Sequence, residues 1–199
     1  MGPTSQYFEA LEDSRRHHAA SKTFSGSLLR PHAPFIKEII DRLGCASILD
    51  YGCGKGVQYE WQNNDPIGSI PVGMTIGKFW GIPITMYDPA FPPFAKEPTG
   101  KFDIVICTHT LGAIPIGDLP WVIGRLHSLA NKAVYVAEKL GPVKKKVFRS
   151  PAEMPSGWSA DRWREILRAN HRSGVELHFA ARTIAADGAK TVAREIIGR

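Results

Sequence analysis

The clearest chemical pattern in this 199-residue sequence is a run of alternating glycines, Asp50-Tyr51-Gly52-Cys53-Gly54-Lys55-Gly56, which follows the apolar residues Ile48 and Leu49. Glycines let a backbone turn sharply and come close to a ligand. Asp50 can accept hydrogen bonds from a cationic amino group or from a neighbouring backbone amide. The run therefore predicts a ligand-binding loop at the end of a buried strand.

Two better-known glycine loops do not fit this spacing. The dinucleotide-binding pattern G-x-G-x-x-G fails because Val57 stands where the third glycine would follow Gly52 and Gly54. The phosphate-binding P-loop fails because Lys55 is followed by Gly56 rather than by serine or threonine.

Short apolar runs alternate with segments of helical periodicity along the chain, which predicts an α/β fold with a mostly parallel sheet flanked by helices. We expect a single domain over residues 1–199, with an N-terminal helical cover over 1–44 and an α/β core over 45–199. The tail predicts either a hairpin or a strand and a short helix around Asp187-Gly188. The predicted strands are 47–50, 83–87, 102–108, 133–137 and 175–184, and the predicted helices are 5–21, 35–43, 72–80, 119–129 and 160–170, with a loop over 23–34 and one or two helical turns over 57–62.

The segment Ile48–Gly56 resembles motif I of class I S-adenosylmethionine-dependent methyltransferases, and Ile84–Pro89 and Phe102–Cys107 resemble the motifs that end later strands in that family. The resemblance covers about residues 45–140. It implies a Rossmann-like fold, S-adenosylmethionine as cofactor and methyl transfer as the reaction. Its motifs imply a cofactor site at Asp50, Tyr51, Gly52, Cys53, Gly54, Gly56, Asp88, Pro89 and Thr108.

In this resemblance Asp88 holds the ribose, since a carboxylate can accept hydrogen bonds from two vicinal hydroxyls. His109 follows the strand 102–108 on the ligand side and is the candidate catalytic residue, with packing beside the cofactor as the alternative role. The tetrapeptide Asp88–Phe91 also resembles the D-P-P-Y motif of adenine-N6 DNA methyltransferases, but it follows the wrong strand. We therefore favour the ribose site.

Two departures from the family pattern stand out. Residues 89–101 contain four prolines and a glycine, which predicts that the family's third strand and its helix are reduced or lost. Gly112 and Ala113 stand where related proteins often carry an acidic residue and a histidine. Phe91 or Phe94 could stack on the adenine.

The composition limits the other classes of function. A formal net charge of +6, with basic clusters at 144–149 and 162–172, leaves nucleic acid open as a partner without requiring it. Three cysteines without C-x-x-C spacing predict neither a disulfide framework nor a metal site. The sequence has no secretory h-region and no membrane span, so we expect a cytoplasmic protein with no membrane partner. The methyl acceptor is expected to be a small molecule. A nucleic-acid or nucleotide methyltransferase and a non-catalytic cofactor-binding protein are the alternatives.

Overall fold

The computed structural model describes residues 2–20, 27–64, 70–140, 153–155, 157–184 and 190–199. Six strands and five α-helices run through these residues in the order α1 (Ser5–Ala20), α2 (Ala33–Leu43), β1 (Ile48–Tyr51), α3 (Ile76–Trp80), β2 (Ile84–Tyr87), β3 (Phe102–Thr108), α4 (Leu119–Leu129), β4 (Ala130–Lys139), α5 (Ala160–Ala169), β5 (Glu176–Ile184) and β6 (Lys190–Gly198).

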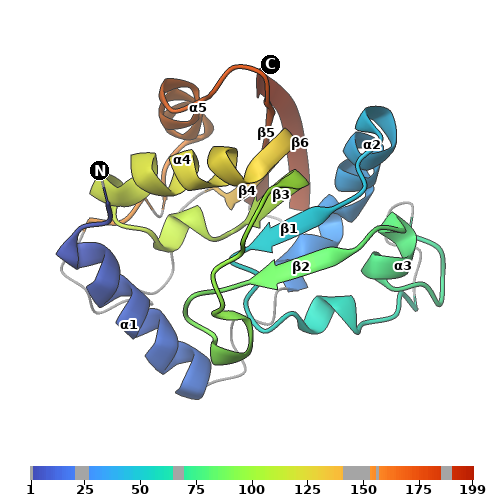
Figure 1. The fold of residues 1–199 in the computed structure, drawn as a ribbon, viewed down its shortest axis with the longest axis horizontal. Coiled ribbons are helices and arrows are strands. Elements are labelled where there is room, and N and C mark those ends of the chain that lie inside the picture. The colour runs from blue at the N-terminus through green and yellow to red at the C-terminus, as the bar shows by residue number, and fades with distance from the viewer. Residues whose placement is uncertain (1, 21–26, 65–69, 141–152, 156, 185–189) are drawn as a thin grey trace.

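The strands form one sheet in the order β2-β1-β3-β4-β5-β6 (Figure 1). Neighbouring strands from β2 to β5 are parallel, and β6 pairs antiparallel with β5 at the edge. The predicted α/β fold with a mostly parallel sheet is therefore confirmed. The tail forms the hairpin alternative, and its predicted turn at Asp187-Gly188 lies outside the described residues.

Each face of the sheet is covered by its own apolar core. On one face α4 and α5 pack with side chains such as Val105, Val136 and Trp163, and the start of α1 joins them through Tyr7. On the other face α2 and α3 pack on side chains that include Ile104 and Tyr135. Because both faces are covered, the central strands are apolar at almost every position, as buried parallel strands usually are.

Local signals in the sequence explain most of the helix boundaries. Gly44 adopts the left-handed conformation that ends α2, and the Ser159 hydroxyl accepts the Arg162 amide to begin α5. α3 begins at Ile76 rather than at Val72, because residues 71–74 form a turn with Gly73 at φ +80°, and the Thr75 hydroxyl then accepts the Lys78 amide to begin the helix. The predicted loop over 23–34 instead contains the 3₁₀ helix Ser27–His32 and the first residues of α2.

The stretch between β2 and β3 contains no strand or α-helix. Residues 89–101 are all described, their only helix is the 3₁₀ turn Pro92–Phe94, and β2 is left as an edge strand of the sheet. The prediction of a reduced third unit is confirmed. Proline-rich sequence cannot supply the donors of a central strand.

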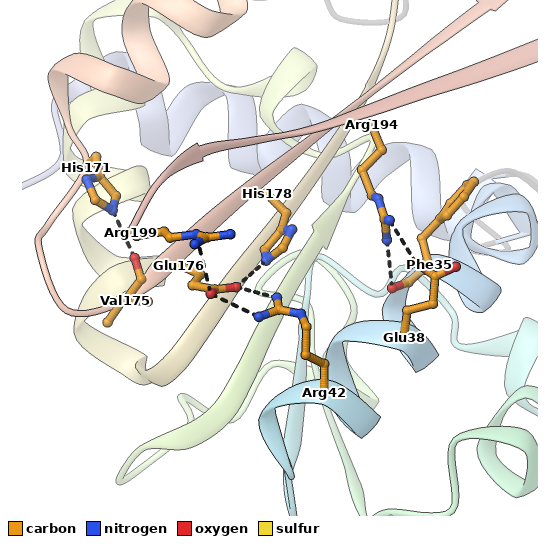
Figure 2. Close-up of polar contacts among 9 residues, drawn as sticks. All are labelled: Phe35, Glu38, Arg42, His171, Val175, Glu176, His178, Arg194 and Arg199. Atoms are coloured by element: carbon orange, nitrogen blue, oxygen red, sulfur yellow. Dashed lines mark hydrogen bonds and ion pairs between the residues drawn. The ribbon is translucent and has the colours of Figure 1, made fainter.

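An ion-pair cluster ties α2 to the far edge of the sheet (Figure 2). Glu176 on β5 accepts hydrogen bonds from Arg42 of α2, at 3.1 Å from Nη1, and from His178, at 3.0 Å. Arg194 on β6 forms an ion pair with Glu38 at 2.7 Å. The contacts of Arg42 with Glu176 and of Arg194 with Glu38 join segments more than a hundred residues apart in the chain, so they fix the layer that carries α2 against the sheet.

Candidate functional site

A cavity of about 240 Å³ lies at the carboxyl ends of β1, β2 and β3, where ligands bind in open parallel sheets. The loops after these three strands form its floor, and one face of α1 forms a further wall. Most of the wall is apolar, and a few polar groups converge on it, as in typical small-molecule sites. The lining residues are Tyr7, Ala10, Leu11, Ser14, His18, Leu28, Asp50, Tyr51, Gly52, Cys53, Gly54, Gln58, Asp88, Pro89, Ala90, Thr108, His109, Thr110, Ala113 and Ile114.

The glycine loop after β1 requires glycine for two separate reasons. Gly52 has φ +83°, in the left-handed region that side chains disfavour, and a Cβ built there would lie 2.3 Å from Thr110 Oγ1. Its amide donates to the Tyr87 carbonyl at 2.7 Å, which ties the loop to the end of β2. The loop is therefore held between two strand ends, with backbone rather than side chain facing the cavity.

Asp88 lies at the end of β2 and connects its own turn to the glycine loop. Its Oδ2 accepts the Gly54 amide at 2.9 Å, and its Oδ1 accepts the Ala90 amide at 2.9 Å. The Nε2 atom of His18, from α1, lies 3.8 Å from Oδ2. An ionised carboxylate offers about four acceptor positions, so each oxygen of Asp88 retains capacity for a further donor.

Asp50 is the most deeply buried carboxylate of the cavity wall, with 1% of its surface exposed. The Tyr59 hydroxyl donates to Oδ2 at 2.8 Å, while Oδ1 is buried and has no hydrogen-bond partner. Burial raises the pKa of Asp50 to about 7, and the negative charge of Asp88 adds to this, although the Tyr59 hydrogen bond opposes it. Asp50 therefore presents an unsatisfied acceptor, which a cationic donor would both complete and ionise.

His109 follows β3 and has φ +57°, the only positive φ among the described residues other than glycine. Its amide donates to the Ala137 carbonyl at 2.7 Å, and its ring nitrogen Nε2 lies 3.3 Å from Nε2 of His32. Burial lowers the pKa of His109 to about 3, with His32, Arg182 and Lys139 acting in the same direction. Strained backbone of this kind persists only where the surroundings hold it, and it is common at functional sites.

The structure brings nine of the ten residues of the predicted site to one cavity. His109 and the eight predicted cofactor residues Asp50, Tyr51, Gly52, Cys53, Gly54, Asp88, Pro89 and Thr108 all line it. Gly56 does not line it. A Cβ at that position would lie 2.8 Å from Met86 Sδ and 3.0 Å from Phe94, so this glycine permits the loop to pack on its neighbours. That each of these residues binds a cofactor stays a prediction.

The face of α1 is the part of the site that the sequence did not reveal. Tyr7, Ala10, Ser14 and His18 recur at intervals of three or four, so they share one side of the helix and line the cavity together. The spacing can be read in the sequence, but side chains this small or polar are common on any exposed helix face, so they do not indicate that the face binds a ligand. The suggested adenine contact Phe91 is outside the lining and stacks on His18 instead, with ring centroids 5.4 Å apart.

The family comparison gives the class of the protein. A family model described as a methyltransferase domain matches residues 9–142, which include most of α1, the glycine loop, β3 and all of β4. The chain therefore belongs to the class I S-adenosylmethionine-dependent methyltransferases, and it is a methyltransferase enzyme. No curated protein and no solved structure matches the sequence. Within the part of the chain that the structure describes, no helix is both long and apolar enough to cross a bilayer.

Proposed function

We propose that this protein transfers a methyl group from S-adenosylmethionine to a small-molecule acceptor. The observation that carries the proposal is the meeting, in one cavity, of the glycine loop, the free acceptor capacity of Asp88 and the unsatisfied oxygen of Asp50. Members of this family typically use this cofactor.

The polar groups of the cavity fit the two ends of such a cofactor. Asp88 has acceptor capacity for the two ribose hydroxyls after satisfying Gly54 and Ala90. The orphaned Oδ1 of Asp50 suits the ammonium of the methionine part, since a buried carboxylate requires a paired charge. Backbone of Gly52 and Gly54 leaves room between these two acceptors. His109 approaches from β3, on the opposite side of β1 from Asp88.

When bound, the cofactor supplies an electrophilic methyl group on a sulfonium, which is already an activated leaving group. The protein's own contribution is then to place two reactants in line and to exclude water. The covering helix α1 suits the second task, because Tyr7, Ala10 and Leu11 close the cavity with mainly apolar surface. Cys53 is not a competing nucleophile, since burial raises the pKa of its thiol.

The structure favours a small acceptor over nucleic acid. Two of the three arginines on α5 are already paired: Arg162 contacts Glu165, and Arg164 contacts Asp161 and Glu195. A phosphate backbone would have to compete with these carboxylates. The other basic cluster, at 144–149, lies outside the described residues. We propose further that the protein is cytoplasmic and acts without a membrane partner.

Thermal unfolding with S-adenosylmethionine, S-adenosylhomocysteine and NAD, added separately, tests cofactor binding. A ligand that binds only the native state stabilises it by about 2.7 kcal/mol at a hundred times its dissociation constant. We expect stabilisation by both adenosyl ligands and none by NAD. The Asp88→Asn variant should lose most of the response.

Asp103→Asn is the matched control, because Asp103 also accepts a backbone amide, from Ala46 at 2.7 Å, but lies at the start of β3, at the end of the strand far from the cavity. It should keep the full ligand response. Stabilisation by NAD alone, or an undiminished response in Asp88→Asn, would refute the proposed site. Product formation across a panel of acceptors, together with salt-dependent oligonucleotide binding, then separates the small-molecule, nucleic-acid and non-catalytic alternatives.

A further inference from the structure

Three side chains form a hydrogen-bonded chain that runs from the cavity wall into the core. The ring of His109 lines the cavity, and its Nε2 lies 3.3 Å from Nε2 of His32. The other ring nitrogen of His32, Nδ1, lies 2.9 Å from the hydroxyl of Tyr135. His32 and Tyr135 are both fully buried, and they come from the residue before α2 and from β4.

With both rings neutral, as their lowered pKa values indicate, only two arrangements of hydrogens are consistent with these contacts. In the first, the Tyr135 hydroxyl donates to His32 Nδ1, His32 Nε2–H donates to His109 Nε2, and His109 carries its hydrogen on Nδ1. In the second, every bond runs the other way, and the buried Tyr135 hydroxyl hydrogen has no acceptor among the described residues. His109 Nδ1 is buried without a partner in both. The first arrangement leaves one group unsatisfied and the second leaves two, so the first is favoured.

We propose that His32, with Tyr135 behind it, is a positioning residue that holds His109 in its neutral Nδ1–H form, as a hydrogen-bond donor toward the ligand rather than a general base. This inference rests on the proposed function of the cavity, because it concerns the acceptor end of the same site.

The surroundings of His109 also oppose its taking up a proton. Its charged and titratable neighbours are His32, Arg182 on β5 and Lys139 on β4, and all of them disfavour a cationic ring. Arg182 is 8% exposed and forms no ion pair with any residue that the structure describes, so its charge acts on the histidines without compensation. Burial, with help from Arg182, also lowers the pKa of His32 to about 4.

The chain of rings cannot carry a proton away either. In the second arrangement His109 Nδ1 is free to take a proton, but one would then have to leave through His32 and Tyr135, and the Tyr135 hydroxyl ends in the core without a further acceptor in the described residues. The arrangement therefore fixes an orientation and a tautomer. It does not form a proton pathway.

A fixed donor in place of a base limits the class of acceptor. The acceptor atom must already carry a free lone pair at working pH, as a thiolate, an uncharged amine or a carboxylate does. That lone pair forms the new bond to the methyl carbon while the carbon–sulfur bond breaks and its electron pair stays on sulfur. No proton needs to be removed beforehand, whereas an alcohol would require a base.

Nitrogen-15 NMR of the histidine rings tests the inference, because it distinguishes the two neutral tautomers and the charged form. The wild type is compared with His32→Gln, whose amide N–H can still donate to His109 Nε2, and with His32→Leu, which has no donor. Each protein is recorded alone and with S-adenosylhomocysteine. We expect His109 to be neutral and almost wholly Nδ1–H in the wild type and in His32→Gln, and to become a mixture of tautomers in His32→Leu.

Addition of S-adenosylhomocysteine should shift the His109 ring signals in the wild type and in His32→Gln. A purely structural role of His32 would change unfolding temperature but would leave the His109 tautomer and its ligand response unchanged. An Nε2–H or charged His109 in the wild type, or an unchanged tautomer in His32→Leu, would overturn the inference. If neither the wild type nor either variant binds S-adenosylhomocysteine, the proposed function of the cavity is refuted. The tautomers measured without ligand then still decide whether His32 orients His109.

Discussion

Replacing Asp50 with asparagine should stabilise the free protein while weakening its ligand binding. The Asp50 carboxylate is 1% exposed, and burial raises its pKa from 3.8 to about 7. The shift of about 3 units corresponds to a cost of about 4 kcal/mol for holding this charge in the folded state. The side chain of the Asp50→Asn variant would carry no charge, and its carbonyl oxygen could still accept the Tyr59 hydroxyl.

The sign of the pH dependence follows from the direction of the shift. The unfolded chain loses the Asp50 proton near pH 4, whereas the folded chain holds it until about pH 7. Stability that depends on this proton is therefore present at low pH and falls as the pH rises from about 4 to about 7. The advantage of Asp50→Asn over the wild type should be near zero at pH 4 and should grow to at most about 4 kcal/mol at pH 8, reduced by the unpaired amide hydrogens of asparagine.

Urea unfolding of both proteins between pH 4 and pH 8 measures this difference, and calorimetry with S-adenosylhomocysteine measures binding. Loss of one charge-assisted hydrogen bond should weaken binding about 10- to 150-fold. Asp103→Asn again serves as the control, because it loses the ion pair with Lys132 and should be less stable than the wild type at pH 8. A gain for Asp50→Asn that is equal at pH 5 and pH 8, or a loss of stability at pH 8, would refute the reasoning.

Three further substitutions test other parts of the structure. Gly52→Ala should lower the free energy of unfolding by at least about 2 kcal/mol, because residue 52 has a positive φ and the new Cβ would meet Thr110. It should also remove the ligand response in a thermal shift assay. Adding Thr110→Ala should restore only part of the stability, since the positive φ remains. Glu176→Gln should cost about 1–3 kcal/mol in urea at pH 7. Because Arg42 holds the pKa of Glu176 at about 2, the stability difference between the wild type and Glu176→Gln should be fully present above about pH 4.5 and should shrink as the pH falls toward 2. A stability difference that did not change with pH would contradict the ion-pair account. Trp163→Ala should cost about 3–5 kcal/mol, since this ring is 1% exposed in the core beneath α5, and a smaller loss at unchanged unfolding cooperativity would show that the core collapses around the gap.

The sequence was sufficient to predict the strand ends that build the site. Asp50, Asp88 and His109 each follow an apolar run, and parallel strands bring their carboxyl ends to one edge of the sheet, so local pattern alone placed these residues together. The glycine positions were equally readable, because their spacing reflects backbone requirements within a single loop.

Contacts between distant segments could not be predicted in the same way. Tyr135 reads as an ordinary buried strand residue, and nothing in its neighbourhood indicates a hydrogen bond to His32, 103 positions earlier. The boundary of α3 was misplaced for a related reason, since the turn before it is held by backbone hydrogen bonds that join Asn63 to Gly73 and Met74, and these depend on tertiary structure rather than on helix periodicity. Propensity and pattern describe one segment at a time, and packing overrides them where segments meet.

The position of α1 has a consequence for the local stability of this helix. The helix is fastened at its start by the Thr4–Asp118 hydrogen bonds and by the edge-to-face contact of Tyr7 with Trp121, at 5.1 Å, while its other residues form a wall of the cavity. A nucleoside-sized ligand in this cavity would pack against α1, so its binding would oppose local detachment of the helix. Amide hydrogen exchange along α1 should therefore slow when ligand is bound.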